Sequence, residues 1–231
     1  MRKLIELGTR IVGRVRRSRI VTLPAGKLVK VNLGCGLHVA PDWINIDGSL
    51  NAWIAERPGW FHRLAYRFSG ARQFYSEENY CEVLGNHKFV HHELAYGVPL
   101  PDRSADFVFS CHFLEHLDRD VAFRLLKDCG RVLKQTGVLR IVVPDLEYVL
   151  ALHGRGEKEE MLHYFFMQCD GSSYSHHRWM YDYEMMADTL KRAGFANIRR
   201  CQFQEGQTPD LKLLDNRAES SLFVEAEPGP G

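Results

Sequence analysis

The sequence predicts an α/β domain in which short strands alternate with helices and build a mostly parallel sheet covered on both faces. Short apolar runs recur at residues 28–33, 43–46, 106–110 and 138–143, and the first of them breaks at a Gly-Cys-Gly turn. Helical stretches lie before and after the last of these runs. Runs that are apolar almost throughout are typical of strands buried on both faces of a sheet.

The composition narrows the class of protein. The chain has 231 residues, of which 45% are hydrophobic, and a net charge of +1. This length fits one domain, and the balanced charge gives no general attraction for a polyanion, so we expect no nucleic-acid partner. The six cysteines stand singly, which indicates reduced thiols and a cytoplasmic location. No apolar run reaches the roughly 18 residues that a membrane span needs.

A basic extension, residues 1–26, precedes the domain, which we expect at residues 27–231. Its apolar residues recur at helical spacing, so we expect a helix. Charged residues, among them Glu6, interrupt any signal-peptide core. Two positions for this helix stay open. It can pack on the domain edge, which is the simpler expectation, or residues 1–20 can lie on an anionic membrane surface.

The middle of the chain continues the alternation of strands and helices. Residues 89–91 are expected to form the third strand. Residues 120–133 are expected to form a helix, because their apolar positions recur with a period of 3.6 residues. Gly137 restarts the chain into the buried run at 138–143, where Arg140 is the one exception to the apolar pattern. Asp145 can then cap the next helix.

The last part of the chain predicts a helix and two strands. Residues 184–192 are expected to be helical and to end at Gly194, where left-handed backbone geometry favours glycine. Residues 198–203 and 221–226 are strand candidates separated by a loop, so they can pair antiparallel at one edge of the sheet.

Two stretches do not fit simple alternation. Residues 51–88 are long for a single connection and rich in aromatic residues and arginine, so we expect an insertion there. Residues 154–181 hold a charged helix followed by the loop CDGSSYSHHRWMY. Both are expected over the carboxyl ends of the strands, where open α/β sheets bind ligands. The second stretch is expected to act as a lid, held at its end by Trp179, Met180 and Tyr181.

The segment VKVNLGCG, which ends at Gly36, carries the sharpest chemical signal. A strand that enters a tight glycine turn lets backbone N–H groups approach a ligand without an intervening Cβ. A dinucleotide site would need a third glycine, where this chain has Val39, and an acid about 20 residues on. The acid here is Asp47, only 13 residues after Gly34. The spacing therefore argues against a nicotinamide cofactor.

Several motifs in order resemble those of class I S-adenosylmethionine (SAM)-dependent methyltransferases, in particular predicted members associated with sugar and polysaccharide modification. They are VNLGCG, PDWINID, LPDRSADFVFSCHFLEHL, RVLKQTGVLRIVVPDLE, HRWMYDYEMMADTLKRAGF and LFVEA. The resemblance covers residues 28–226 except 51–88. It implies a Rossmann-like, seven-stranded, mostly parallel sheet with helices on both faces and the last strand antiparallel. It also implies S-adenosyl-L-methionine as cofactor and a small-molecule or sugar-containing acceptor.

The resemblance also implies where the cofactor binds. Gly34 and Gly36 would make room for its carboxypropyl arm, and Asp47 would accept both ribose hydroxyls. Asn32 stands where many relatives have an acid; its amide can accept a hydrogen bond but lacks the charge. The implied cofactor-binding residues are Asn32, Gly34, Cys35, Gly36, Asp47, Glu93, Leu94, Ser110 and His112.

Histidines are the natural candidates for a base, because an imidazole titrates near neutral pH. The candidates are His112, His116, His176 and His177. Each of these histidines can also serve as a helix cap or an ordinary loop residue. We expect no metal site, because the adjacent pairs His91–His92 and His176–His177 lack the helical spacing of metal ligands.

Two rival functions remain open. One is an aminopropyltransferase on the same sheet, which loops rich in His, Tyr and Arg disfavour. The other is a non-catalytic binding or scaffold domain that retains the fold. The amide at Asn32 favours the scaffold, and the intact set of Gly34, Gly36 and Asp47 argues against it. The acceptor atom and the oligomeric state are not encoded in any recognisable pattern.

Overall fold

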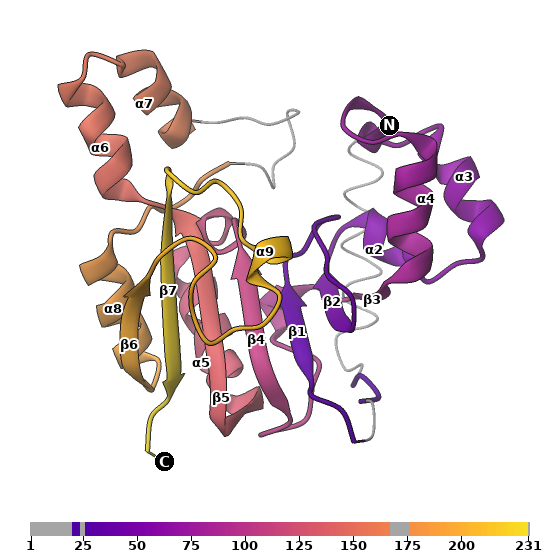
Figure 1. Ribbon diagram of the computed structural model, residues 1–231, viewed down its shortest axis with the longest axis horizontal. Helices are drawn as coiled ribbons and strands as arrows, with labels where there is room; N and C mark the ends of the chain where they lie inside the picture. The colour runs from indigo at the N-terminus through magenta and orange to yellow at the C-terminus, as the bar shows by residue number, and fades with distance from the viewer. Residues whose placement is uncertain (1–19, 24–25, 167–175, 231) are drawn as a thin grey trace.

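The computed structural model describes residues 20–23, 26–166 and 176–230 (Figure 1). Most of the basic extension at residues 1–26, with its expected helix, therefore lies outside the described residues, as does the start of the expected lid loop. Within the described ranges, no helix is both long and apolar enough to cross a membrane.

Seven strands form one sheet in the order β3-β2-β1-β4-β5-β7-β6, with β7 antiparallel to both of its neighbours. This confirms the predicted mostly parallel sheet and its antiparallel last strand. The strands are β1 (Lys30–Leu33), β2 (Trp43–Asp47), β3 (Lys88–His91), β4 (Ala105–Cys111), β5 (Leu133–Pro144), β6 (Phe195–Cys201) and β7 (Ser221–Pro228).

The boundary between the helix α5 (Arg119–Val132) and the strand β5 differs from the predicted one. The helix ends at Val132, and Leu133 already belongs to the strand. The register between β4 and β5 shifts between Ala105 and Phe107, so the strand passes through Gly137 with a bulge instead of starting there. A Cβ at Gly137 would lie only 2.8 Å from the Leu133 side chain, which explains the glycine.

One face of the sheet is a conventional apolar core. Side chains of the parallel strands, such as Val31, Val108 and Ile141, pack there with α5 and with α8 (Tyr183–Arg192). Asp182 caps α8 by accepting a hydrogen bond from the Met185 N–H at 2.8 Å. The chain leaves α8 through Gly194 in the predicted left-handed conformation (φ 98°).

The two irregular stretches fold into short helices. The insertion forms α2 (Leu50–Ala55), α3 (Gly59–Tyr66), a 3₁₀ turn η1 (Gly70–Gln73) and α4 (Glu77–Asn86). These elements gather at the β3 side of the sheet (Figure 1). Their apolar core includes Cys35 from the turn after β1. Beyond the carboxyl end of β5 lie α6 (Leu146–Gly154), which Asp145 caps as predicted, and α7 (Lys158–Phe166).

The opposite face of the sheet has an unusual cover. The connection from β1 to β2, residues 34–42, contains no helix. The long loop between β6 and β7, with the short helix α9 (Leu211–Leu214), lies across this face instead (Figure 1). Asp210 accepts hydrogen bonds from the Trp43 indole at 2.8 Å and from the Lys30 ammonium at 2.7 Å. The loop thereby covers the area that a helix after β1 would cover.

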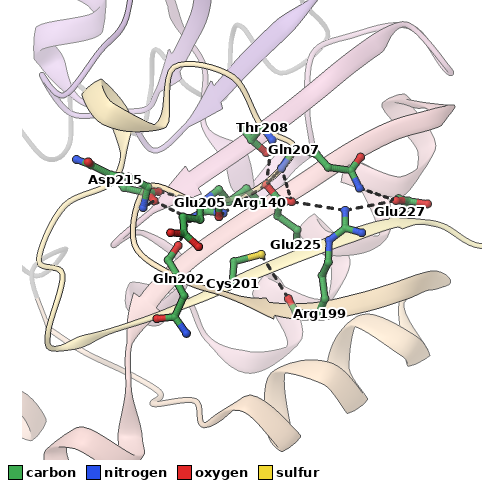
Figure 2. A network of polar contacts seen from close by, with 11 residues as sticks. Arg140, Arg199, Cys201, Gln202, Glu205, Gln207, Thr208, Asp215, Glu225 and Glu227 are labelled. Atoms are coloured by element: carbon green, nitrogen blue, oxygen red, sulfur yellow. Dashed lines mark hydrogen bonds and ion pairs between the residues drawn. The ribbon is translucent and has the colours of Figure 1, made fainter.

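A buried ion cluster holds this loop in place (Figure 2). The fully buried Arg140 guanidinium makes a bidentate pair with Asp215, at 3.0 and 2.5 Å, and lies 3.3 Å from Glu225. Its two remaining N–H groups donate to the Gln202 and Glu205 carbonyls. All five donors of the arginine therefore have an acceptor, as a buried guanidinium requires.

Replacement of Arg140 by Met should destabilise the protein by about 3–5 kcal/mol, because Asp215 and Glu225 would be left buried without their cation. Urea unfolding followed by circular dichroism measures the loss. Arg199→Gln is the matched control, since Arg199 also pairs with Glu225 but is 39% exposed. It should cost no more than about 1 kcal/mol. Equal losses in the two variants would contradict a special role for Arg140.

The same cluster predicts a pH dependence of stability. Burial raises the pKa of the Glu225 carboxyl, but hydrogen bonds from the Gln207 and Thr208 backbone and the charge of Arg140 outweigh burial and lower it below its usual value. A lowered pKa contributes stability above the unfolded-state value, about 4.3, that is lost as the pH falls through the folded-state value. The free-energy gap between the wild type and Glu225→Gln should therefore narrow between pH 6 and pH 3, as about ten urea titrations across that range would show. A gap independent of pH would contradict this assignment.

Candidate functional site

The turn after β1 lies at the carboxyl edge of the sheet and depends on a glycine at its first position. Gly34 has φ 64°, and its N–H donates to the Ile46 carbonyl at 2.9 Å. A Cβ on Gly34 would overlap the Phe113 ring. The glycine is therefore required by its neighbour as well as by its backbone conformation.

Gly36 stands in a different environment. Its φ is 53°, and no atom lies within 4 Å of the position that a Cβ would take. Its N–H donates to Asp47 Oδ2 at 2.8 Å. Between the two glycines, Cys35 is buried; burial, with a smaller contribution from Asp47, raises the pKa of its thiol well above the usual value. The Cys35 thiol is therefore buried and neutral and does not act as a nucleophile.

Asp47 ends β2 and ties the turn to the next loop. Its second carboxylate oxygen, Oδ1, accepts from the Ser49 N–H at 2.6 Å. Each oxygen thus accepts one backbone N–H and keeps further lone pairs. The residue Asp47 is 9% exposed, at the edge where β1, β2 and β3 end.

Asn32 lies deeper, on the face of the sheet that the β6–β7 loop covers. Its amide N–H₂ donates to the His38 carbonyl at 2.9 Å and to Asn45 Oδ1 at 3.1 Å. The side chain is thus engaged inside the protein. It supports the backbone of the β1–β2 connection.

Glu93 and Leu94 follow β3 at the same edge. Glu93 caps the 3₁₀ turn η2 (Leu94–Tyr96), where its Oε1 accepts from the Ala95 N–H at 3.3 Å. Its other oxygen lies 3.5 Å from the Cβ position of Gly48. The Leu94 side chain belongs to the core, so only the backbone of Leu94 is available to a ligand.

Ser110 and His112 lead out of β4. Ser110 is buried, and its Oγ has no hydrogen-bond partner among the described residues. His112 adopts a left-handed conformation (φ 48°), and its Nε2 lies 3.0 Å from Ser221 Oγ. Its Nδ1 lies 3.3 Å from Glu115 Oε1, close enough for an ion pair when the imidazole is protonated, although the angles are not those of a hydrogen bond.

Glu115 is the centre of a buried polar cluster. It is completely buried, and neither carboxylate oxygen has a hydrogen bond within the described residues. His116 Nε2 lies 3.9 Å from Glu115 Oε1. Burial raises the pKa of the Glu115 carboxyl, but the neighbouring His112 and His116 outweigh burial and lower it below its usual value.

His177 completes this cluster from a distant part of the chain. Its ring lies 5.1 Å from that of His116, centre to centre. The Nδ1 of His177 is 2.6 Å from the Tyr164 carbonyl, and the Nδ1 of His116 is 3.1 Å from the His176 carbonyl. His176 thus joins the cluster through its backbone. Burial lowers the pKa of His177 below its usual value.

The segment that follows His177 is docked firmly. The N–H groups of Arg178 and Trp179 donate to the Glu115 carbonyl at 2.7 and 3.2 Å. The Arg119 guanidinium lies over the Trp179 ring at 4.2 Å. Met180 and Tyr181 are buried, so the end of the loop is anchored as predicted. Residues 167–175 of the expected lid stretch 154–181 lie outside the described residues.

Three residues of this site escaped the sequence analysis. Phe113 packs on Gly34, Ser49 donates to Asp47, and Ser221 contacts His112. The position of Phe113 between His112 and Glu115 was an available signal. The sequence held no signal for Ser221, because this residue follows His112 by 109 residues. The two side chains come into contact only through the pairing of β5 with β7.

Comparison with known proteins gives one family match. A family model described as a methyltransferase domain matches residues 68–141, from before α4 into β5. The match covers less than half of the chain and does not include the glycine turn. No curated protein sequence matches the chain.

Several solved structures are similar to this chain at low sequence identity. A SAM-dependent methyltransferase from Thermotoga maritima, described as a possible histamine N-methyltransferase, has a TM-score of 0.50 and 17% identity and covers 97% of this chain and 88% of its own. A SAM-dependent methyltransferase from Archaeoglobus fulgidus has a TM-score of 0.49 and 16% identity, covering 96% and 93%. A structure of DhpI in complex with SAH has a TM-score of 0.49 and 17% identity, covering 98% and 87%.

The family match and the order of the seven strands lead to the same assignment. The sheet order and its antiparallel strand are those of the Rossmann-like methyltransferase fold. Residues 68–141 match a methyltransferase-domain family model, and the chain has the fold of SAM-dependent methyltransferases; together these findings imply S-adenosyl-L-methionine as its cofactor.

Proposed function

We propose that this protein transfers a methyl group from S-adenosyl-L-methionine to a small-molecule or sugar-containing acceptor. One observation carries the proposal: the glycine turn and the buried Glu115–histidine cluster are neighbours. They are joined by Phe113, whose ring packs on Gly34 and which stands between His112 and Glu115 in the sequence. A turn suited to the cofactor and a cluster suited to the acceptor thus meet at one edge of the sheet.

The residues at the turn fit the cofactor. Gly36 has open space where a side chain would stand. Asp47 keeps lone pairs for ribose hydroxyls after accepting two backbone N–H groups. Glu93 and the Leu94 backbone, at the end of β3, are suited to contact the adenine of the cofactor. Cys35 and Ser110 are suited to line the cofactor site. Asn32 acts indirectly in this proposal, through the backbone of the β1–β2 connection.

When bound, the cofactor supplies an electrophilic methyl group; the protein must position the acceptor and accept its proton. The candidates for this base are His112, His116, His176 and His177. Since the Nδ1 atoms of His116 and His177 face backbone carbonyls, these atoms carry the protons and each Nε2 keeps a lone pair. That tautomer is the one that can accept a proton from a hydroxyl acceptor.

A scaffold without catalytic activity is the second candidate function. The contact between Phe113 and Gly34 favours it, because the ring takes up space beside the turn. Calorimetric titration with S-adenosylhomocysteine decides between them: binding with a micromolar dissociation constant supports the methyltransferase, and no binding at millimolar ligand supports the scaffold. Methyl-tritiated SAM, offered with a panel of sugars, phenols and amines, then tests the acceptor class.

We also propose a cytoplasmic site of action. The five cysteines within the described ranges are all free. Free thiols are the usual state of proteins in a reducing compartment. Contact of residues 1–20 with a membrane surface stays a prediction about a segment of which only Ile20 lies within the described ranges.

Asp47→Asn should weaken binding of S-adenosylhomocysteine at least tenfold, because an amide loses both the charge and one of the two acceptors that hold Gly36 and Ser49. Isothermal titration calorimetry measures this affinity. Asp42→Asn is the matched control: it removes an exposed acid from the same connection, at a left-handed position that Asn tolerates, and should leave affinity unchanged. Similar losses in both variants would mean that charge near the turn, and not Asp47 itself, matters.

A second-site experiment separates the two reasons for the glycine at position 34. Gly34→Ala should lower both the melting temperature and the affinity for S-adenosylhomocysteine. Adding Phe113→Ala removes the overlap with the ring, so the double variant should regain part of the melting temperature. Its affinity should stay at least tenfold weaker than that of Phe113→Ala alone if the cofactor passes over Gly34. Full recovery of affinity would make the glycine purely structural.

A further inference from the structure

We propose that Glu115, His116 and His177 bind a divalent transition-metal ion. One ligand atom from each residue lies within 4.8 Å of the other two, so one ion can reach all three after small side-chain adjustments. Two of these residues follow β4, and the third comes from the segment docked on Glu115 by Arg178 and Trp179. The tertiary fold, and not local spacing, brings the ligands together.

The carboxylate is the first argument for a cation. Glu115 is completely buried, and neither of its oxygens has a hydrogen bond within the described residues. Burial of a carboxylate without hydrogen bonds is costly, and buried charges are normally paired or coordinate metals. The nearest partner, His112 Nδ1 at 3.3 Å, does not make a well-aligned hydrogen bond. A cation between Glu115, His116 and His177 would satisfy the free oxygens.

The orientation of the two imidazoles is a second, independent argument. The Nδ1 atoms of His116 and His177 both face backbone carbonyls, those of His176 and Tyr164. This contact fixes the tautomer that leaves the Nε2 lone pair free, and it is the outer contact that metal-binding histidines characteristically make. His116 Nε2 already lies on the Glu115 side, 3.9 Å from the carboxylate.

The ligand set indicates the class of ion. Two imidazoles and one carboxylate suit Zn²⁺, Fe²⁺ or Co²⁺, whereas Mg²⁺ and Ca²⁺ prefer oxygen ligands. Three protein ligands leave coordination positions open, as in catalytic sites. With the ion bound, the Nε2 atoms of His116 and His177 are ligands and accept no proton, so His112 and His176 are the base candidates that remain. This part of the inference depends on the proposed function: the open positions would select acceptors that offer oxygen atoms, such as neighbouring hydroxyls of a sugar.

The test is a titration of the chelator-treated full-length protein with Co²⁺, followed by visible absorption and calorimetry. We expect one equivalent to bind with a dissociation constant of micromolar or below, with d–d absorption bands that excess Zn²⁺ abolishes and Mg²⁺ does not. Glu115→Gln and His177→Ala should each weaken Co²⁺ binding at least 100-fold. Circular dichroism verifies that each variant is folded. If Glu115→Gln does not fold, His177→Ala alone still tests the proposal.

His87→Ala is the matched control. The Nδ1 of His87 also lies near a backbone carbonyl, that of Val83 at 3.0 Å, but His87 belongs to no metal-ligand cluster within the described residues. This variant should bind Co²⁺ like the wild type. Absence of stoichiometric binding by the wild type, or equal binding by wild type and His177→Ala, would overturn the proposal. S-adenosylhomocysteine titrations of the same samples report separately on the methyltransferase function, so failure of one proposal is distinguishable from failure of the other.

Discussion

The buried guanidinium of Arg140 organises the sheet face on which, within the described residues, the β1–β2 connection supplies no helix. The β1–β2 connection has no helix, so the sheet face beneath it needs another cover. Arg140 supplies the means, because its five donors hold Asp215, Glu225 and two carbonyls of the β6–β7 loop. Backbone N–H groups of the same loop, those of Gln207 and Thr208, donate hydrogen bonds to the Glu225 carboxylate. A loop that would otherwise be free thus becomes a wall of the domain.

The influence of this cluster reaches the candidate site through a short series of contacts. Asp215 directly follows α9, whose Leu214 carbonyl lies 2.9 Å from His38 Nε2. The His38 carbonyl accepts from Asn32, which lies beneath the glycine turn. Gly206 lets the loop approach closely, since a Cβ there would lie 2.7 Å from Arg140 Nη1. Burying three charged groups is expensive, and complete pairing of the arginine is what makes the arrangement tolerable.

Local sequence patterns predicted the helices and strands well. They did not predict which distant side chains pair with one another. The apolar runs located the strands of the sheet, and Asp145 and Gly194 marked helix ends, because these signals depend on neighbours along the chain. Arg140 stood out as an exception in an apolar run, but nothing local identified Asp215, 75 residues away, as its partner. The histidines show the same limit. The adjacent pairs His91–His92 and His176–His177 stand out in the sequence, whereas the structure combines His116 with His177 and uses His176 only for its backbone. Side chains that converge only through tertiary packing leave no periodic trace in a sequence.

The position of β7 has a consequence for how the protein is made. It follows β6 in the chain yet lies between β5 and β6, so the sheet cannot be completed in the order of synthesis. Until the ribosome has delivered β7, Arg140 lacks Glu225 and β6 has no neighbour in the sheet. Pairings between distant segments form slowly, and an unpaired strand edge invites aggregation in the meantime. A nascent chain of this protein is therefore expected to need protection, such as that of a chaperone, until its last strand emerges.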